Sequence, residues 1–181
     1  MYTTEFLALS DLTKYGSWIK SQDRETLYLY FGSVVGSESI DLLIRKIALN
    51  FENNHILIAK IDGAWAGTIH IAVNGKDVEF GIIVSAPYRK HGIASLMMDE
   101  AITWAQNRGY QNLYMHYINK NLPIRHLCKK HGLKPCNMIG ESEAKLKLDL
   151  PSPTTYLKEF LFAQRNFLAS NLILHSKNLF C

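Results

Sequence analysis

The chain has 181 residues, of which 48% are hydrophobic and 20% charged, and its formal net charge is +4. This length and apolar content provide for one well-buried domain and exclude a disordered chain. The mild excess of positive charge favours an acidic ligand, but no Lys/Arg run with interleaved aromatic residues points to nucleic acid.

Cysteine usage and hydropathy limit the compartment. The three cysteines, Cys128, Cys136 and Cys181, show neither CxxC nor His/Cys ligand spacing. We therefore expect a reducing, cytoplasmic environment, with no disulfide framework and no metal site. The first residues lack the charged and apolar regions of a signal peptide, and no apolar stretch approaches the ~20 residues of a membrane span.

The first half of the chain predicts a strand, several helices and a three-strand meander. The strand is 3–8, the helices are 11–20, 22–32 and a longer one from Ser37, and the meander is 55–61, 64–73 and 77–84. Asp62-Gly63 and Asn74-Gly75, which separate the last three segments, are typical two-residue hairpin turns. The three strands are therefore expected to be antiparallel.

The stretch from Val78 to Ala105 combines a strand, a basic glycine loop and a helix. Arg89, Lys90 and His91 precede Gly92 at the helix start, where the first N–H groups lack partners and attract anions. Gly92 has no Cβ, so a ligand can approach its backbone closely. A pyrophosphate cradle is one interpretation, and a solvated basic turn is the other, because short glycine patterns also occur by chance.

The remaining segments complete an α/β domain with a mixed sheet. Strand 111–117 follows the helix and can lie parallel to 77–84 through one crossover. A helix over 121–131 and strands over 134–139 and 143–149 come next. Because Pro151-Ser152-Pro153 marks a boundary, we expect one domain over residues 1–150 and a helical extension over 151–181.

The helical extension carries a wide apolar stripe. Tyr156, Phe160 and Phe167 lie on one side of the predicted helix 154–174, and Leu157, Leu161 and Leu168 lie on another. A monomer rarely exposes so much apolar surface. We therefore expect this helix to be covered by its own domain or to form a homodimer contact.

Two motifs resemble a known family. Arg89-x-x-Gly92-x-Ala94 is similar to the Arg/Gln-x-x-Gly-x-Gly/Ala signature of the GNAT superfamily of acyl-CoA-dependent N-acetyltransferases. Residues 121–133, Asn-Leu-Pro-Ile-Arg-His-Leu-Cys-Lys-Lys-His-Gly-Leu, resemble its second motif, an asparagine-led helix. The resemblance covers roughly residues 54–149 and implies an α/β fold with a mostly antiparallel mixed sheet flanked by helices, to which the C-terminal helix is extra.

The resemblance implies acetyl-CoA as cosubstrate. It places the pyrophosphate on the backbone amides from Arg89 to Ser95, the pantetheine arm along the strand backbone, and Asn121 against the same arm. A sheet that opens between 77–84 and 111–117 would leave backbone groups free for that arm. The expected cofactor-binding residues are Ile82, Ile83, Val84, Arg89, Lys90, His91, Gly92, Ile93, Ala94, Ser95 and Asn121.

Glu79 is the expected general base. It lies ten residues before Arg89, in a Val-Glu-Phe-Gly-Ile-Ile-Val segment that resembles bacterial protein lysine acetyltransferases, where a strand glutamate at this spacing serves as base. A carboxylate on a half-buried strand is partly desolvated, which suits a general base. A solvent-facing strand charge is the alternative, and His70 and His116 are the other candidates.

The expected general acid departs from the family. Many members carry a tyrosine seven residues after the motif asparagine, and this chain has Cys128 there. The leaving thiolate would then be protonated by the thiol, Tyr114, Tyr117 or a water, or the general acid would be absent. The candidate catalytic residues are thus Glu79, Cys128 and Tyr117.

Two function classes remain open. The first is an N-acetyltransferase that acts by direct amine attack, on a small molecule or on a protein lysine or N-terminus. The second is a CoA-binding sensor or assembly module that has lost catalysis, suggested by Cys128 and the apolar C-terminal helix. ATP binding is disfavoured, because no Lys-Ser/Thr follows the glycine. The acceptor is expected to contact segments 10–50 and 134–149, which indicate no particular amine.

Overall fold

The structure is a computed structural model that describes residues 1–137 and 141–178. Its described residues form one seven-stranded sheet in the order β1-β2-β3-β4-β5-β7-β6. All neighbouring strands are antiparallel except β4 and β5, which are parallel. The strands are β1 (Tyr2–Phe6), β2 (Asn54–Ile61), β3 (Ala64–Asn74), β4 (Asp77–Val84), β5 (Asn112–Ile118), β6 (Lys134–Asn137) and β7 (Glu141–Lys147).

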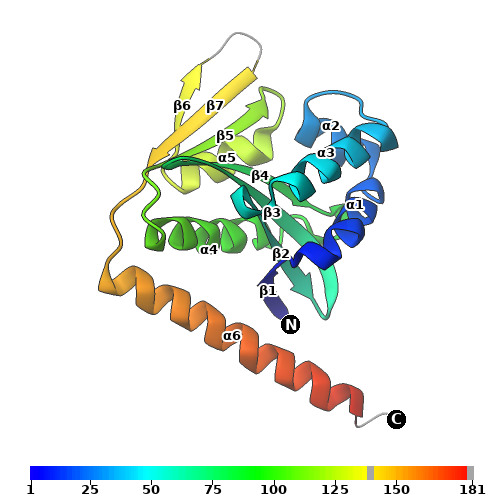
Figure 1. Ribbon diagram of the computed structural model, residues 1–181, viewed down its shortest axis with the longest axis vertical. Coiled ribbons are helices and arrows are strands. Elements are labelled where there is room, and N and C mark those ends of the chain that lie inside the picture. The colour runs from blue at the N-terminus through cyan, green and yellow to red at the C-terminus, as the bar shows by residue number, and fades with distance from the viewer. Residues whose placement is uncertain (138–140, 179–181) are drawn as a thin grey trace.

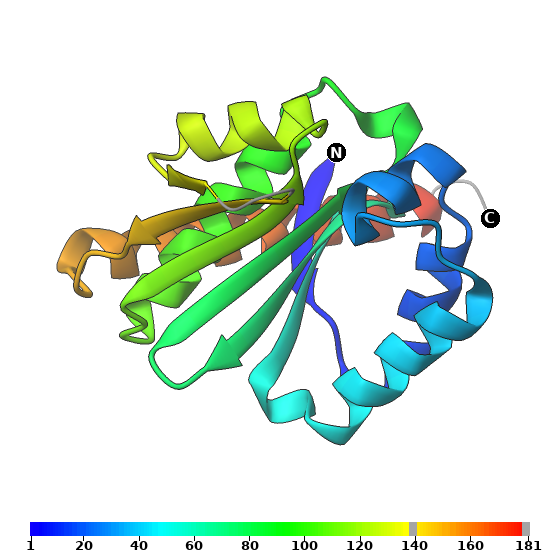
Figure 2. The same ribbon diagram turned by 90° about the horizontal axis from the view of Figure 1, so that it is seen from above.

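Helices cover both faces of this sheet. On one face lie α1 (Leu12–Lys20), α2 (Arg24–Phe31) and α3 (Ser37–Leu49), and on the other lie α4 (Ile93–Asn107) and α5 (Leu122–Lys130) (Figure 1, Figure 2). Each face has its own buried hydrophobic cluster. This arrangement confirms the predicted fold class, a mixed and mostly antiparallel sheet flanked by helices. Short 3₁₀ helices occur at Leu9–Asp11, Phe51–Asn53 and Ala86–Tyr88.

Alternation along β4 decides which side chains reach which face. Phe80 and Ile82 pack in the cluster beneath α4, whereas Ile83 packs in the cluster beneath α1 and α3. Because successive side chains of a strand point to opposite faces, Glu79 lies on the same face as Ile83. The glutamate therefore faces the side of the sheet that carries α1, α2 and α3.

The sheet opens between β4 and β5, as predicted. The two strands pair only at Asp77 with Asn112, Val78 with Leu113 and Glu79 with Tyr114. Both strands continue beyond that point, β4 to Val84 and β5 to Ile118, and both are described throughout. The far half of β4 thus has backbone groups on its β5 side that a ligand can use.

The C-terminal helix α6 (Pro153–Asn178) lies across α4 and β1 and extends beyond the body of the domain (Figure 1). Polar contacts hold it there. Arg165 Nη2 lies 2.8 Å from Glu100 Oε2, and Asn166 Nδ2 donates to Thr4 Oγ1 at 2.9 Å. None of the described helices is long and apolar enough to cross a membrane. Residues 138 and 139 of the predicted strand 134–139 lie outside the described residues.

Candidate functional site

Two cavities meet where β4 and β5 separate. The first, about 420 Å³ in volume, is lined mainly by β3, β4, β5 and α2, and we call it the sheet cavity. The second, about 610 Å³, is lined mainly by the end of β4, the 88–95 loop and α5, and we call it the loop cavity. Their shared lining residues are Leu29, Tyr30, Ile82, Asn121 and Ile124. A ligand held in one cavity can therefore reach a ligand in the other.

The loop cavity gathers the residues that the sequence assigned to the cofactor. All of them line it except His91, which is exposed on the loop. The backbone there is unusual, since Lys90 has φ 63° and Gly92 has φ 78°. Positive φ is uncommon for a non-glycine residue such as Lys90. Along this path the start of α4 lines the cavity.

The N-terminus of α4 is open to the cavity. Gly92 is its N-cap, and among the described residues no side chain caps it. A Cβ built on Gly92 would meet no heavy atom within 4 Å. The first N–H groups of a helix have no partners inside it, and they sit at the positive end of its dipole. This arrangement suits an anion such as a pyrophosphate.

The charges around the loop cavity add to this preference. Its lining includes Arg89, Lys90, Lys120 and Lys130, against the single carboxylate of Glu25. The sheet cavity differs, since its described lining includes Glu79 but neither lysine nor arginine. The two cavities therefore favour ligands of opposite charge.

The Arg89 side chain is turned toward α2. Its Nε donates to Val84 O at 3.2 Å, its Nη2 bonds to Thr26 Oγ1, and the same nitrogen lies 3.5 Å from Asp23 Oδ2. Hydrogen bonds from Thr26, and secondarily the Arg89 charge, hold the pKa of Asp23 below its usual value. Arg89 thus joins the glycine loop to the start of α2, and α2 lines both cavities. No local pattern predicted this contact, because its partners are far apart along the chain.

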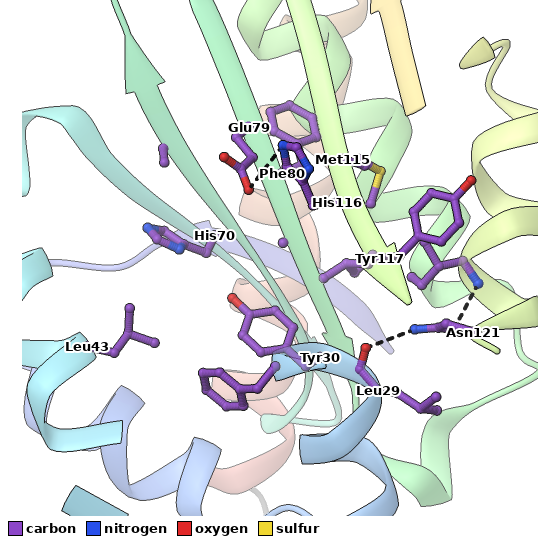
Figure 3. A pocket seen from close by; sticks show the side chains of 15 residues that line it. Leu29, Tyr30, Leu43, His70, Glu79, Phe80, Met115, His116, Tyr117 and Asn121 are labelled. Carbon is purple, nitrogen blue, oxygen red and sulfur yellow. Dashed lines mark hydrogen bonds and ion pairs between the residues drawn. The ribbon is translucent and has the colours of Figure 1, made fainter. Parts of the chain in front are cut away.

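Asn121 is also bound within the protein. It is buried, its Oδ1 accepts from Ile124 N at 3.2 Å, and its Nδ2 donates to Leu29 O at 3.2 Å (Figure 3). It therefore caps α5 and connects that helix to α2. Its expected contact with the pantetheine arm remains a prediction.

Glu79, His70 and His116 converge on the sheet cavity from three neighbouring strands (Figure 3). His116 Nε2 lies 4.0 Å from Glu79 Oε1 and 3.6 Å from Glu143 Oε2. The Glu79 side chain is 55% exposed, so the carboxylate is open to solvent as well as to the cavity. The sequence did not single out Glu143, which the pairing of β5 with β7 places opposite His116.

His70 is half-buried and is the least exposed member of this group. Burial, and secondarily His55, lowers its pKa to about 4. Its Nε2 lies 2.8 Å from Asn54 Oδ1, which matches a neutral ring donating to the amide oxygen. His70 is therefore uncharged at neutral pH.

Cys128 and Tyr117 belong to the same hydrophobic cluster, but only Tyr117 lines a cavity. Cys128 is 2% exposed, and its Sγ packs 3.8 Å from Met115 Sδ. Burial raises the pKa of this thiol to about 11. The thiol lies in the core beneath α4 and outside the lining of both cavities, so its placement does not support the expected acid role. Tyr117 lines the sheet cavity, and burial raises its pKa.

The described residues include no group of three or more His, Cys, Asp or Glu side chains that could hold a metal ion. The site offers the carboxylate of Glu79, the imidazoles of His70 and His116 and the phenol of Tyr117, close to the free backbone amides at the start of α4. Such a site suits proton transfer next to a bound phosphate ester.

Comparison with known proteins agrees with this geometry. Residues 20–133, more than half of the chain, match the model of the acetyltransferase (GNAT) family. An acetyltransferase of the GNAT family from Streptococcus pneumoniae has a similar structure, with a TM-score of 0.65 and 20% identity over 82% of this chain and 100% of that one.

Two further solved structures have a similar fold. Spermidine N-acetyltransferase from Vibrio cholerae, in complex with CoA and spermine, gives a TM-score of 0.67 at 14% identity over 86% of this chain and 98% of that one. PaiA N-acetyltransferase from Thermoplasma acidophilum, in complex with coenzyme A, gives 0.62 at 16% identity over 81% and 99%. At such low identity these matches support the fold alone.

Proposed function

Because the chain belongs to the acetyltransferase (GNAT) family, we propose that it moves an acetyl group from acetyl-CoA to a primary amine by direct attack, without a covalent intermediate. One observation carries this proposal. A cationic cavity over an open helix N-terminus adjoins a cavity with a carboxylate and no described cationic lining residue. An anionic donor and a cationic acceptor would thus meet at the gap between β4 and β5.

The loop cavity would hold the donor. The amides that begin α4 would take the pyrophosphate, with Lys90, Lys120 and Lys130 around it. The backbone from Ile82 to Val84, beyond the last β4–β5 pair, would take the pantetheine arm. Acetyl-CoA supplies the activated acetyl thioester, and the protein holds it beside the sheet cavity.

The sheet cavity would prepare the amine. A lysine-like amine has a pKa near ~10.4, so only about one part in 10³ is neutral at pH 7. The Glu79 carboxylate would attract the ammonium form and accept its proton, with His116 4.0 Å away to share the charge. Tyr117, at the wall of the same cavity, is our candidate for protonating the thiolate.

The experiment is thiol release from acetyl-CoA with a panel of small amines, polyamines, lysine peptides and protein N-termini. Turnover with at least one class of amine supports the proposal. The relative from Vibrio cholerae is a spermidine acetyltransferase, which places polyamines in the panel. A second candidate is a CoA-binding sensor, favoured by the absence of a cavity-facing thiol or tyrosine at position 128. Tight CoA binding without turnover on any amine would select the sensor.

Replacing Cys128 with alanine should leave kcat within about twofold, because the thiol lies outside both cavities. The variant should lose on the order of 1 kcal/mol of stability through the small cavity it leaves. Steady-state kinetics and thermal unfolding measure the two effects. A loss of kcat of tenfold or more in a fully folded variant would restore Cys128 as the acid.

We also propose that α6 forms a homodimer contact. Six large apolar side chains on it are more than half exposed: Tyr156, Leu157, Phe160, Leu161, Phe167 and Leu168. Its opposite face is already held by the body through Glu159, Arg165 and Asn166. A second copy would present the same stripe, so a two-fold pair of α6 helices buries both.

Replacing both Phe160 and Phe167 with glutamate should convert the dimer into a monomer of 20.6 kDa. Sedimentation at micromolar concentration measures the mass of each form. Leu49→Glu is the matched control, because Leu49 is 88% exposed on α3 and should not affect the dimer. A wild-type protein that sediments as a monomer would refute the contact.

A further inference from the structure

Three polar side chains form a relay behind the loop cavity. Ser95 lies in the first turn of α4 and lines the cavity, and its Oγ lies 3.0 Å from His131 Nε2. His131 Nδ1 lies 3.4 Å from Asp99 Oδ1, one turn further along α4. The His131 side chain is only 6% exposed and does not line the cavity, so it would act on a ligand there through Ser95.

The proton on His131 decides what Ser95 presents to the cavity. In the neutral ring the proton on Nδ1 faces the Asp99 carboxylate 3.4 Å away, so Nε2 accepts the Ser95 hydroxyl proton. Ser95 then turns only lone pairs toward the cavity, which disfavours an anion. When Nε2 also carries a proton it donates to Ser95 Oγ, and the hydroxyl proton becomes free to bond an anion.

The charged groups around His131 come from three helices. Burial is the main influence and lowers the pKa of His131, Asp99 of α4 raises it, and Lys130 of α5 and Lys158 of α6 lower it. Without an anion in the cavity, His131 is therefore neutral at neutral pH. An anion bound at Ser95 would raise the pKa of His131, whereas the two lysines lower it.

We propose that His131 and Asp99 are positioning residues for the cofactor's pyrophosphate, and that its binding is coupled to the uptake of one proton by His131 Nε2. The proton comes from solvent and forms an N–H bond at Nε2, while the Ser95 hydroxyl keeps its own proton and turns it to the phosphate. The inference rests on the proposed function, because it requires CoA on the α4 amides.

The coupling makes cofactor affinity depend on pH with a definite sign. Since the bound form holds more protons, affinity rises as pH falls through the titration range of His131. A rise of one unit in the pKa of His131 on binding corresponds to about a tenfold gain in affinity at low pH. Above the titration range of His131, cofactor affinity no longer depends on pH through this residue.

Dephospho-CoA is the suitable probe. It keeps the pyrophosphate but lacks the 3′-phosphate, whose second ionisation near pH ~6 would add its own pH dependence. Calorimetry near pH ~6.5, in non-phosphate buffers of different ionisation enthalpy, measures the protons taken up on binding. We expect a clear fractional uptake and an affinity several-fold higher at pH ~5.5 than at pH ~8, with about tenfold as the low-pH limit for a one-unit rise in pKa.

Variants test whether these three residues or another group cause the proton uptake. His131→Gln should abolish both the uptake and the pH dependence, and Ser95→Ala should do the same because the hydroxyl transmits the effect. Asp99→Asn keeps the histidine but removes the charge that raises its pKa, so its pH dependence should move to lower pH. His55→Gln is the control, because this histidine of β2 lines neither cavity and its loss should leave the uptake and the pH dependence as in the wild type.

The outcomes are distinguishable. A wild-type protein that binds dephospho-CoA without proton uptake would overturn the relay and leave the proposed function in place. Uptake that survives in folded His131→Gln would assign it to another group and also overturn the relay. Failure of the wild type to bind either CoA or dephospho-CoA would remove the proposed function and the relay together.

Discussion

Replacing Glu79 with glutamine should lower kcat for acetyl transfer by about 100- to 10,000-fold, the usual contribution of a general base. The substitution keeps the shape and hydrogen-bonding capacity of the side chain but removes its ability to accept a proton. Affinity for CoA should stay within about twofold, because Glu79 lines the sheet cavity and lies outside the loop cavity. Steady-state kinetics and calorimetry with CoA measure the two quantities separately.

The neighbouring carboxylate gives the matched control. Glu143 lies 3.6 Å from His116, as Glu79 lies 4.0 Å from it, but Glu143 is absent from the described lining of the sheet cavity. Glu143→Gln should therefore lower kcat far less than Glu79→Gln does. If Glu79→Gln kept wild-type rates at every pH while His116→Gln lost them, the base would be the histidine.

Replacing Gly92 with glutamate should weaken CoA binding by about 100-fold or more, which is close to 3 kcal/mol. The position faces open space, so the new side chain enters the loop cavity instead of clashing with the protein. Its negative charge would then oppose the phosphates at the helix N-terminus. Calorimetric titration with CoA measures the loss.

Two controls separate charge from backbone strain. Gly92 has φ 78°, where any side chain is strained by roughly 1 kcal/mol, so Gly92→Ala reports the strain alone. Gly63 has φ 85° in the turn between β2 and β3 and also faces open space, so Gly63→Glu adds the same strain and charge elsewhere. If Gly92→Glu bound CoA as tightly as Gly63→Glu does, the cofactor would have to bind outside the loop cavity.

Local sequence patterns predicted most of the fold. The Asp62-Gly63 and Asn74-Gly75 turns specified the β2–β3–β4 meander, because hairpin geometry depends on a few adjacent residues. The helix after Gly92 and the parallel strand β5 followed from periodicity and crossover rules. The sites of predicted cofactor contact came together for the same reason, since nearly all of them belong to one continuous segment.

Such local patterns could not predict contacts between segments that are distant in the sequence. Arg89 is one residue of a local motif, but its guanidinium finds Asp23 and Thr26 on α2. Cys128 occupies a motif position that many relatives fill with a catalytic tyrosine, yet the packing of Met115 against it places the thiol in the core. Glu79 is 55% exposed in a cavity that α2 also lines, and a strand pattern does not encode the placement of a helix.

The amino-acid sequence by itself determined the order of the elements, the glycine loop at the start of α4 and the family to which these belong, because turns, caps and periodicity are properties of neighbouring residues. Only the tertiary structure decided that β4 and β5 part after Glu79, that Glu143 stands beside His116, and that His131 reaches Ser95. Those arrangements arise from strand register and helix packing, in which the two partners are far apart along the chain.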